Sequence, residues 1–77
     1  MGDNFNEISD LGLAASLSAM GFEIVRVDKS NPKRVVFVFE KSTAVELAVN
    51  DFWSNKLLLP ASSLLDHIRK LKFRIYG

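Results

Sequence analysis

The feature that most restricts the fold of this chain is a strand-like run that is apolar on both faces. The run spans residues 34–40, and because side chains alternate across a strand it splits into two apolar sets: Val35, Phe37 and Phe39 on one face, Val36 and Val38 on the other. A sheet built on this run needs cover on each face. A chain of 77 residues has few elements to supply that cover, and a second copy is one source of it.

The length also limits how the fold is stabilised. A single core is only marginally sufficient at this size, and small domains usually add disulfides, a metal or oligomerisation. The sequence has no cysteine, which excludes disulfides and thiolate ligands, and its one histidine, His67, provides no cluster for zinc. Oligomerisation is the route that remains.

The N-terminal residues and the length of the apolar runs indicate where in the cell the protein is located. Residues 1–7 are acidic and polar, unlike a secretory signal, and no apolar run reaches the ~20 residues of a membrane span. The absence of cysteine fits a reducing compartment. We therefore expect a cytoplasmic protein with no membrane association.

The first half of the sequence predicts a helix and a hairpin. Apolar residues at helical spacing predict a helix over residues 9–20, and Gly21 follows it where a left-handed cap is favoured. Strands are expected over residues 22–28 and 34–40, joined by the turn residues 29–33. Alternation places apolar side chains on both faces of the first strand: Phe22 and Ile24 on one, Val25 and Val27 on the other.

The second half predicts two helices separated by an extended segment. One helix spans residues 43–53, with Ser42 or Thr43 as its cap. Residues 56–59 are expected to form a short edge strand, because the residue before Pro60 disfavours helix. The last helix runs from Pro60 or Ala61 to Tyr76.

Together these elements predict a two-layer α+β fold, ordered helix–strand–strand–helix–(short strand)–helix, with an antiparallel hairpin. Residues 9–77 are expected to form one small domain. Residues 1–8 show no clear pattern, and we predict a disordered N-terminus there.

The candidate residues for catalysis do not form a recognisable set. Asp66 precedes His67, but neighbouring positions on a helix do not face each other, so this carboxylate is not placed to orient the imidazole. The remaining carboxylates are scattered singly, and the four glycines form no phosphate-binding loop. We expect no enzymatic activity, no cofactor, no metal and no small-molecule substrate.

Surplus apolar side chains favour an interaction module. Exposed apolar patches usually mark partner surfaces. The simplest arrangement is a two-fold homodimer, and the sequence does not distinguish it from binding to another protein. The candidate residues for self-association are Val25, Val27, Val36, Val38 and Trp53.

The alternative is a nucleic-acid-binding accessory protein. Its signal is a basic C-terminal helix that carries one aromatic residue suited to stacking on a base, together with basic residues beside the hairpin turn suited to phosphate contacts. The candidate residues are Arg69, Lys70, Lys72, Phe73 and Arg74, with Lys33 and Arg34.

Five segments also carry a resemblance to a known family: residues 10–17, 21–23, 34–40, 51–53 and 71–76. In their order and spacing they resemble a family of short bacterial and phage-associated domains of unknown function. The resemblance covers nearly the whole chain and implies a mobile-element or prophage setting. It implies no activity, cofactor or catalytic residue.

Overall fold

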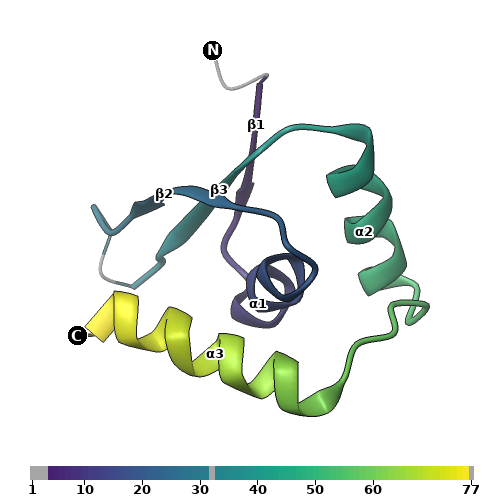
Figure 1. Ribbon diagram of the computed structural model, residues 1–77. Coiled ribbons are helices and arrows are strands. Elements are labelled where there is room, and N and C mark those ends of the chain that lie inside the picture. The colour runs from purple at the N-terminus through teal and green to yellow at the C-terminus, as the bar shows by residue number, and fades with distance from the viewer. Residues whose placement is uncertain (1–3, 32, 77) are drawn as a thin grey trace.

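The computed structural model describes residues 4–31 and 33–76. Residues 1–3, Pro32 and Gly77, which the predictions above include, lie outside this part of the chain. Six elements follow one another in the order β1 (Phe5–Ile8), α1 (Leu11–Ala19), β2 (Ile24–Asp28), β3 (Val36–Glu40), α2 (Thr43–Trp53) and α3 (Ala61–Tyr76) (Figure 1). The fold is therefore of the mixed α+β class, as predicted.

The three strands form one antiparallel sheet with β3 in the centre. The predicted hairpin is present: β2 pairs with β3 from Asp28 opposite Val36 to Ile24 opposite Phe39. On the other side of β3, β1 pairs from Ile8 opposite Phe37 to Phe5 opposite Glu40. The run that is apolar on both faces thus occupies the most enclosed position in the sheet.

The third strand lies at the opposite end of the sequence from the predicted one. Residues 56–59 form no strand, whereas residues 5–8, which we predicted to be disordered, form β1. The Lys41 N–H extends this pairing by donating to the Asn4 carbonyl at 2.9 Å. The four residues of β1 include Asn6 and Glu7, which have low strand propensity, so the partner strand rather than the local sequence stabilises it.

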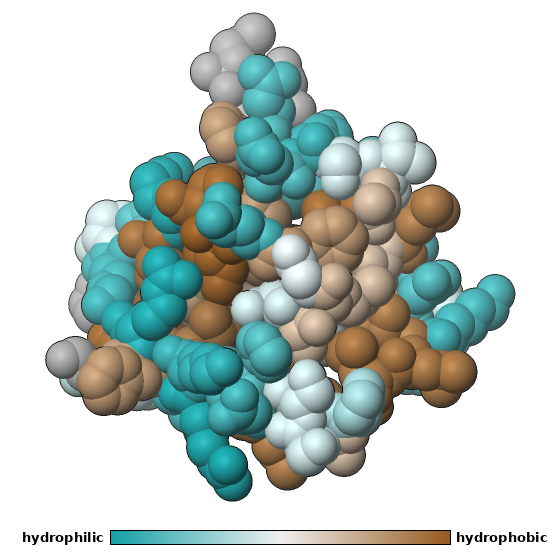
Figure 2. All heavy atoms as spheres, in the orientation of Figure 1, coloured by the Kyte–Doolittle hydropathy of each residue, from teal (hydrophilic) through white to brown (hydrophobic). Residues whose placement is uncertain are grey.

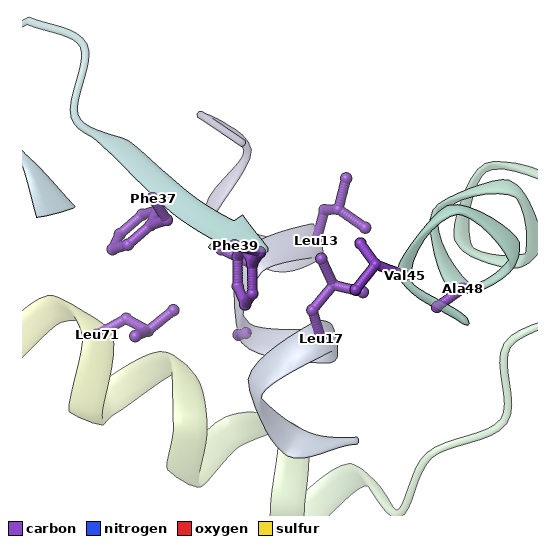
Figure 3. Packing of buried hydrophobic residues seen from close by; sticks show 9 residues of the cluster. Leu13, Leu17, Phe37, Phe39, Val45, Ala48 and Leu71 are labelled. Carbon is purple, nitrogen blue, oxygen red and sulfur yellow. The ribbon is translucent and has the colours of Figure 1, made fainter. Parts of the chain in front are cut away.

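The helices gather on one face of the sheet. Figure 1 shows α1 and α3 beneath the sheet, with α2 beside α1. Phe37 and Phe39 project from β3 into this layer, toward Leu17 of α1 and Leu71 of α3 (Figure 3). Figure 3 also shows Val45 of α2 directed toward α1. This arrangement leaves the opposite face of the sheet, here called the outer face, without a described helix over it.

The helix α1 is buried on several sides because it lies between the sheet, α2 and α3. Its residues from Leu13 to Leu17 are all buried. Two of them, Ala14 and Ala15, are small enough to let neighbouring elements approach closely, and the Ser16 hydroxyl donates to the Gly12 carbonyl at 2.8 Å. The wide apolar arc of this segment is thereby used within a single copy.

Local signals place the helix boundaries. The Leu13 N–H donates to Asp10 Oδ1 at 2.9 Å, and the Val45 N–H donates to Ser42 Oγ at 3.1 Å. Such side-chain caps satisfy amides that the first turn leaves free. Gly21 follows α1 with φ of +100°, as its predicted capping role requires. The bounds of α2 and α3 agree with the prediction.

Candidate interaction surfaces

An extra residue in β2 changes which side chains face outward. Ile24 pairs with Phe39 and Arg26 pairs with Val38, so Val25 forms a β-bulge between them. The bulge shifts the alternation, and Ile24 and Val27 both pack against the core although they are three positions apart. The prediction that Val25 and Val27 share a face is therefore wrong: Val27 lies on the core side, and Val25 is exposed.

Val38 lies at the centre of the outer face. It is only 2% exposed, and it lines a shallow hollow with Phe5, Val25 and Arg26. Side chains from the two flanking strands therefore cover it within one copy of the chain. The exposed apolar surface belongs to those neighbours, since Phe5 is 44% and Val25 42% exposed.

Side chains of opposite charge flank Val38. Glu7 of β1 and Arg26 of β2 are both paired with Val38, and directly opposed residues of an antiparallel pair project to the same face. One rung of the sheet therefore runs from positive through apolar to negative: Arg26, Val38, Glu7. Arg26 Nη1 lies 3.9 Å from Asp28 Oδ2, while Glu7 makes no ion pair with any described residue.

The neighbouring end of the outer face is polar. Half-buried Val36 lines a hollow there with Glu7, Asp28 and Arg34. The Ser30 N–H donates to Asp28 Oδ1 at 2.9 Å, and this hydrogen bond, reinforced by the nearby Arg26, lowers the pKa of Asp28 below its usual value. Val36 therefore borders the apolar centre without adding to it.

The remaining candidate for self-association lies on a different surface. Trp53, at the end of α2, is exposed and meets Phe52 edge to face, with 4.9 Å between the ring centroids. It lines a hollow with Leu57, Leu59 and Leu64, in the region where Figure 2 shows hydrophobic side chains over the segment between α2 and α3. The structure therefore does not bring Trp53 together with the valines.

The predicted basic residues lie on the exposed side of α3. Arg69, Lys72 and Arg74 are exposed, and Lys70 pairs with Asp66, with 3.1 Å between Nζ and Oδ2. Phe73 is 74% exposed. Figure 2 shows hydrophilic side chains over much of this helix. The opposite stripe of α3 packs against the core with Leu64, Ile68, Leu71 and Ile75.

The structure brings the basic residues of the hairpin to the C-terminal end of the basic helix α3. Lys33 in the hairpin turn and Arg34 directly after it line one hollow with Ile75 and Tyr76 at the end of α3. Tyr76 is 82% exposed, and it is not among the residues that the sequence predicts for this surface. Its position seven residues after Arg69 was the available signal, because that spacing returns to the same side of a helix.

The remaining observations concern His67, metal-binding groups and membrane-spanning helices. The ring Nδ1 of His67 lies 2.8 Å from the Ser63 carbonyl oxygen. Among the residues that the structure describes, no three acidic or histidine side chains are grouped so as to hold a metal ion. Within residues 4–31 and 33–76, no helix has the length and apolar character needed to cross a bilayer.

Comparison with known proteins gives a family. The chain belongs to the family described as a domain of unknown function (DUF5659), whose model matches residues 3–77. This confirms the resemblance to a family of unknown function seen in the sequence. Neither a curated protein nor a solved structure matches the chain.

Proposed function

We propose that this member of the family is a non-catalytic protein-interaction domain that self-associates as a two-fold dimer through the outer face of its sheet. The observation that carries the proposal is the rung formed by Arg26, Val38 and Glu7. A rung that is positive at one end, apolar in the middle and negative at the other is complementary to a second copy of itself.

The symmetry of the pairing follows from this pattern. A two-fold axis parallel to β3 stacks the two outer faces and exchanges their sides, so each Arg26 lies over Glu7 of the partner subunit. The same operation brings Phe5 toward Val25 of the partner subunit and covers both exposed side chains. A two-fold axis perpendicular to the strands would instead place Arg26 over Arg26 of the partner subunit. Such like-charge contacts are unfavourable.

The size of the face sets the expected affinity. Three strands of about five residues span roughly 10 Å by 17 Å. This is far below the ~800 Å² that each partner buries in a standard stable interface. We therefore expect a weak dimer with a dissociation constant in the micromolar range or above, populated mainly at high protein concentration.

The test is the solution mass, measured by sedimentation equilibrium from about 10 μM to about 1 mM. Val25→Glu and Phe5→Glu place a charge on the exposed apolar positions and should give a folded monomer. Val38 is not the residue to change first, because it is buried within one copy and its loss perturbs the fold. Trp53→Ala is the matched control and should leave the dimer intact.

A charge exchange separates this interface from others. Glu7→Arg and Arg26→Glu should each weaken the dimer, whereas the double exchange restores the pairing between subunits and should recover it. Because β3 separates these residues within one copy, recovery reports on the contact between copies. A wild-type chain that stays monomeric at about 1 mM, or a double variant no better than either single one, rules the proposal out.

The proposal includes a cytoplasmic setting and a bacterial mobile element or prophage as the source. Its support is the resemblance to bacterial and phage-associated domains and the absence of cysteine from the sequence. Fractionation of cells that produce the tagged chain tests the location. Recovery in the membrane or secreted fraction contradicts that part of the proposal.

A further inference from the structure

We propose that the exposed side of α3 binds single-stranded nucleic acid. The site centres on four residues: Arg69, Lys72, Phe73 and Tyr76. Each is three or four positions from two of the others, so the four side chains form one continuous patch on the helix surface. The patch alternates cationic and aromatic groups.

The aromatic rings are available for stacking. Phe73 and Tyr76 are among the most exposed large hydrophobic side chains of the described residues, and neither belongs to the stripe that packs on the core. They are separated by three helical residues, which is about 4.5 Å along the axis. Rings at that spacing suit neighbouring unpaired bases, and stacking on exposed aromatics requires bases that are not already paired in a duplex.

The cations of the patch are free to meet phosphates. Asp66 is the acidic residue of α3, and it pairs with Lys70 rather than with Arg69 or Lys72. Arg69 and Lys72 make no ion pair within the described residues, and both are exposed. Contacts of this kind with the phosphate backbone supply the affinity of sequence-independent binding.

The hairpin extends the patch beyond α3. Lys33 lines the hollow at the end of the helix together with Tyr76, which places a third cation next to the second ring. Arg34 lines this hollow too, and it also lines the hollow that Glu7 and Asp28 border. The expected path of the strand therefore runs from Arg69 along the helix to Lys33.

The test is fluorescence anisotropy with labelled 20-nucleotide single strands of mixed sequence, with the matching duplex as a competitor. Wild-type protein should bind the single strand at about 50 mM salt. With three phosphate contacts, affinity should fall roughly 20-fold between about 50 and 200 mM salt. Phe73→Ala should weaken binding by about 10-fold or more through loss of stacking.

Matched variants locate the site. Arg69→Ala and Lys72→Ala should each weaken binding, whereas Lys70→Ala, which removes a cation already paired with Asp66, should change it less. The four substituted residues, Arg69, Lys70, Lys72 and Phe73, are all exposed. Circular dichroism checks that each variant is folded. Equal losses for Lys70→Ala and Arg69→Ala, or no loss for Phe73→Ala, overturn the proposal.

Two further experiments test whether the patch binds lipid instead and whether binding depends on the dimer. Vesicles containing phosphatidylglycerol test the patch against an anionic lipid surface, and binding to vesicles without binding to the oligonucleotide overturns the proposal. The monomeric Val25→Glu variant should keep wild-type affinity per site, because Val25 lies on the outer face of the sheet and the patch on α3. Binding by this variant supports the nucleic-acid site even if the dimer is disproved.

Discussion

Asn6 stands directly opposite Phe39 in the pairing of β1 with β3. Phe39 is fully buried, and the Nδ2 of Asn6 is buried as well, without a hydrogen-bond partner among the described residues. A buried donor that has lost water and gained no acceptor costs about 1–3 kcal/mol. The strand β1 therefore carries an internal penalty, which its pairing with β3 offsets.

Replacing this amide should stabilise the fold. Asn6→Val removes the unpaired donor and introduces a β-branched side chain suited to a strand, so the free energy of unfolding should rise by about 1 kcal/mol. Urea denaturation followed by circular dichroism measures the change. Asn6→Asp is the control of equal size: it buries a carboxylate without a partner and should lower the free energy of unfolding. Equal stability of the two variants would mean that the amide is solvated.

Gly21 should resist substitution for a reason unrelated to space. An added Cβ meets no atom within 4 Å, but the backbone has φ of +100°. Residues with a Cβ rarely adopt this conformation, so Gly21→Ala should lower the free energy of unfolding by about 1 kcal/mol. Gly21→Asn should cost less, because Asn tolerates left-handed geometry better. Thermal unfolding of the three proteins checks the order, and an alanine variant as stable as the wild type contradicts it.

Asp28 should contribute to stability in a pH-dependent way. The Ser30 N–H, which donates to Asp28 Oδ1 at 2.9 Å, holds the pKa of this carboxyl below its unfolded value of 3.8. A lowered folded-state pKa stabilises the protein above the unfolded value, and this contribution disappears as the pH falls through the folded one. Wild type should therefore melt at a higher temperature than Asp28→Asn at pH 6, and the difference should shrink by pH 3. A constant difference would exclude this linkage.

Strong local patterns determined what the sequence predicted correctly. The α2 and α3 helices have regular apolar stripes and clear start signals, so their bounds agree with prediction. The strand β1 has only two apolar residues, Phe5 and Ile8, and its conformation depends on a strand about thirty residues later. Propensity within four residues carries no information about that partner.

The candidate surfaces also include features that local sequence patterns predict and features that depend on the whole fold. The sequence predicts Phe73 and its basic neighbours as one group on the last helix, and the structure has all of them exposed on α3. The bulge at Val25 was not predictable, since one extra residue leaves no mark in a short alternating run, and it moved Val27 to the core side. The joining of Lys33 with Tyr76 depends on how α3 docks beneath the hairpin, which is a property of the whole fold.

The two leucines at positions 65 and 71 of α3 test how this helix is docked, because the same substitution should give opposite results at them. Leu71 is 3% exposed and is the buried residue of the helix, whereas Leu65 is 53% exposed. Leu71→Ala removes core contacts and leaves a cavity, so it should lower the free energy of unfolding by about 2–5 kcal/mol, while Leu65→Ala should change it by no more than about 0.5 kcal/mol. Small domains have about 5–15 kcal/mol in total, so the first variant should unfold at a much lower urea concentration than wild type. Urea titrations of both variants decide the matter: equal losses would mean that α3 presents a different stripe to α1, and the patch proposed on its exposed side would then be misplaced as well.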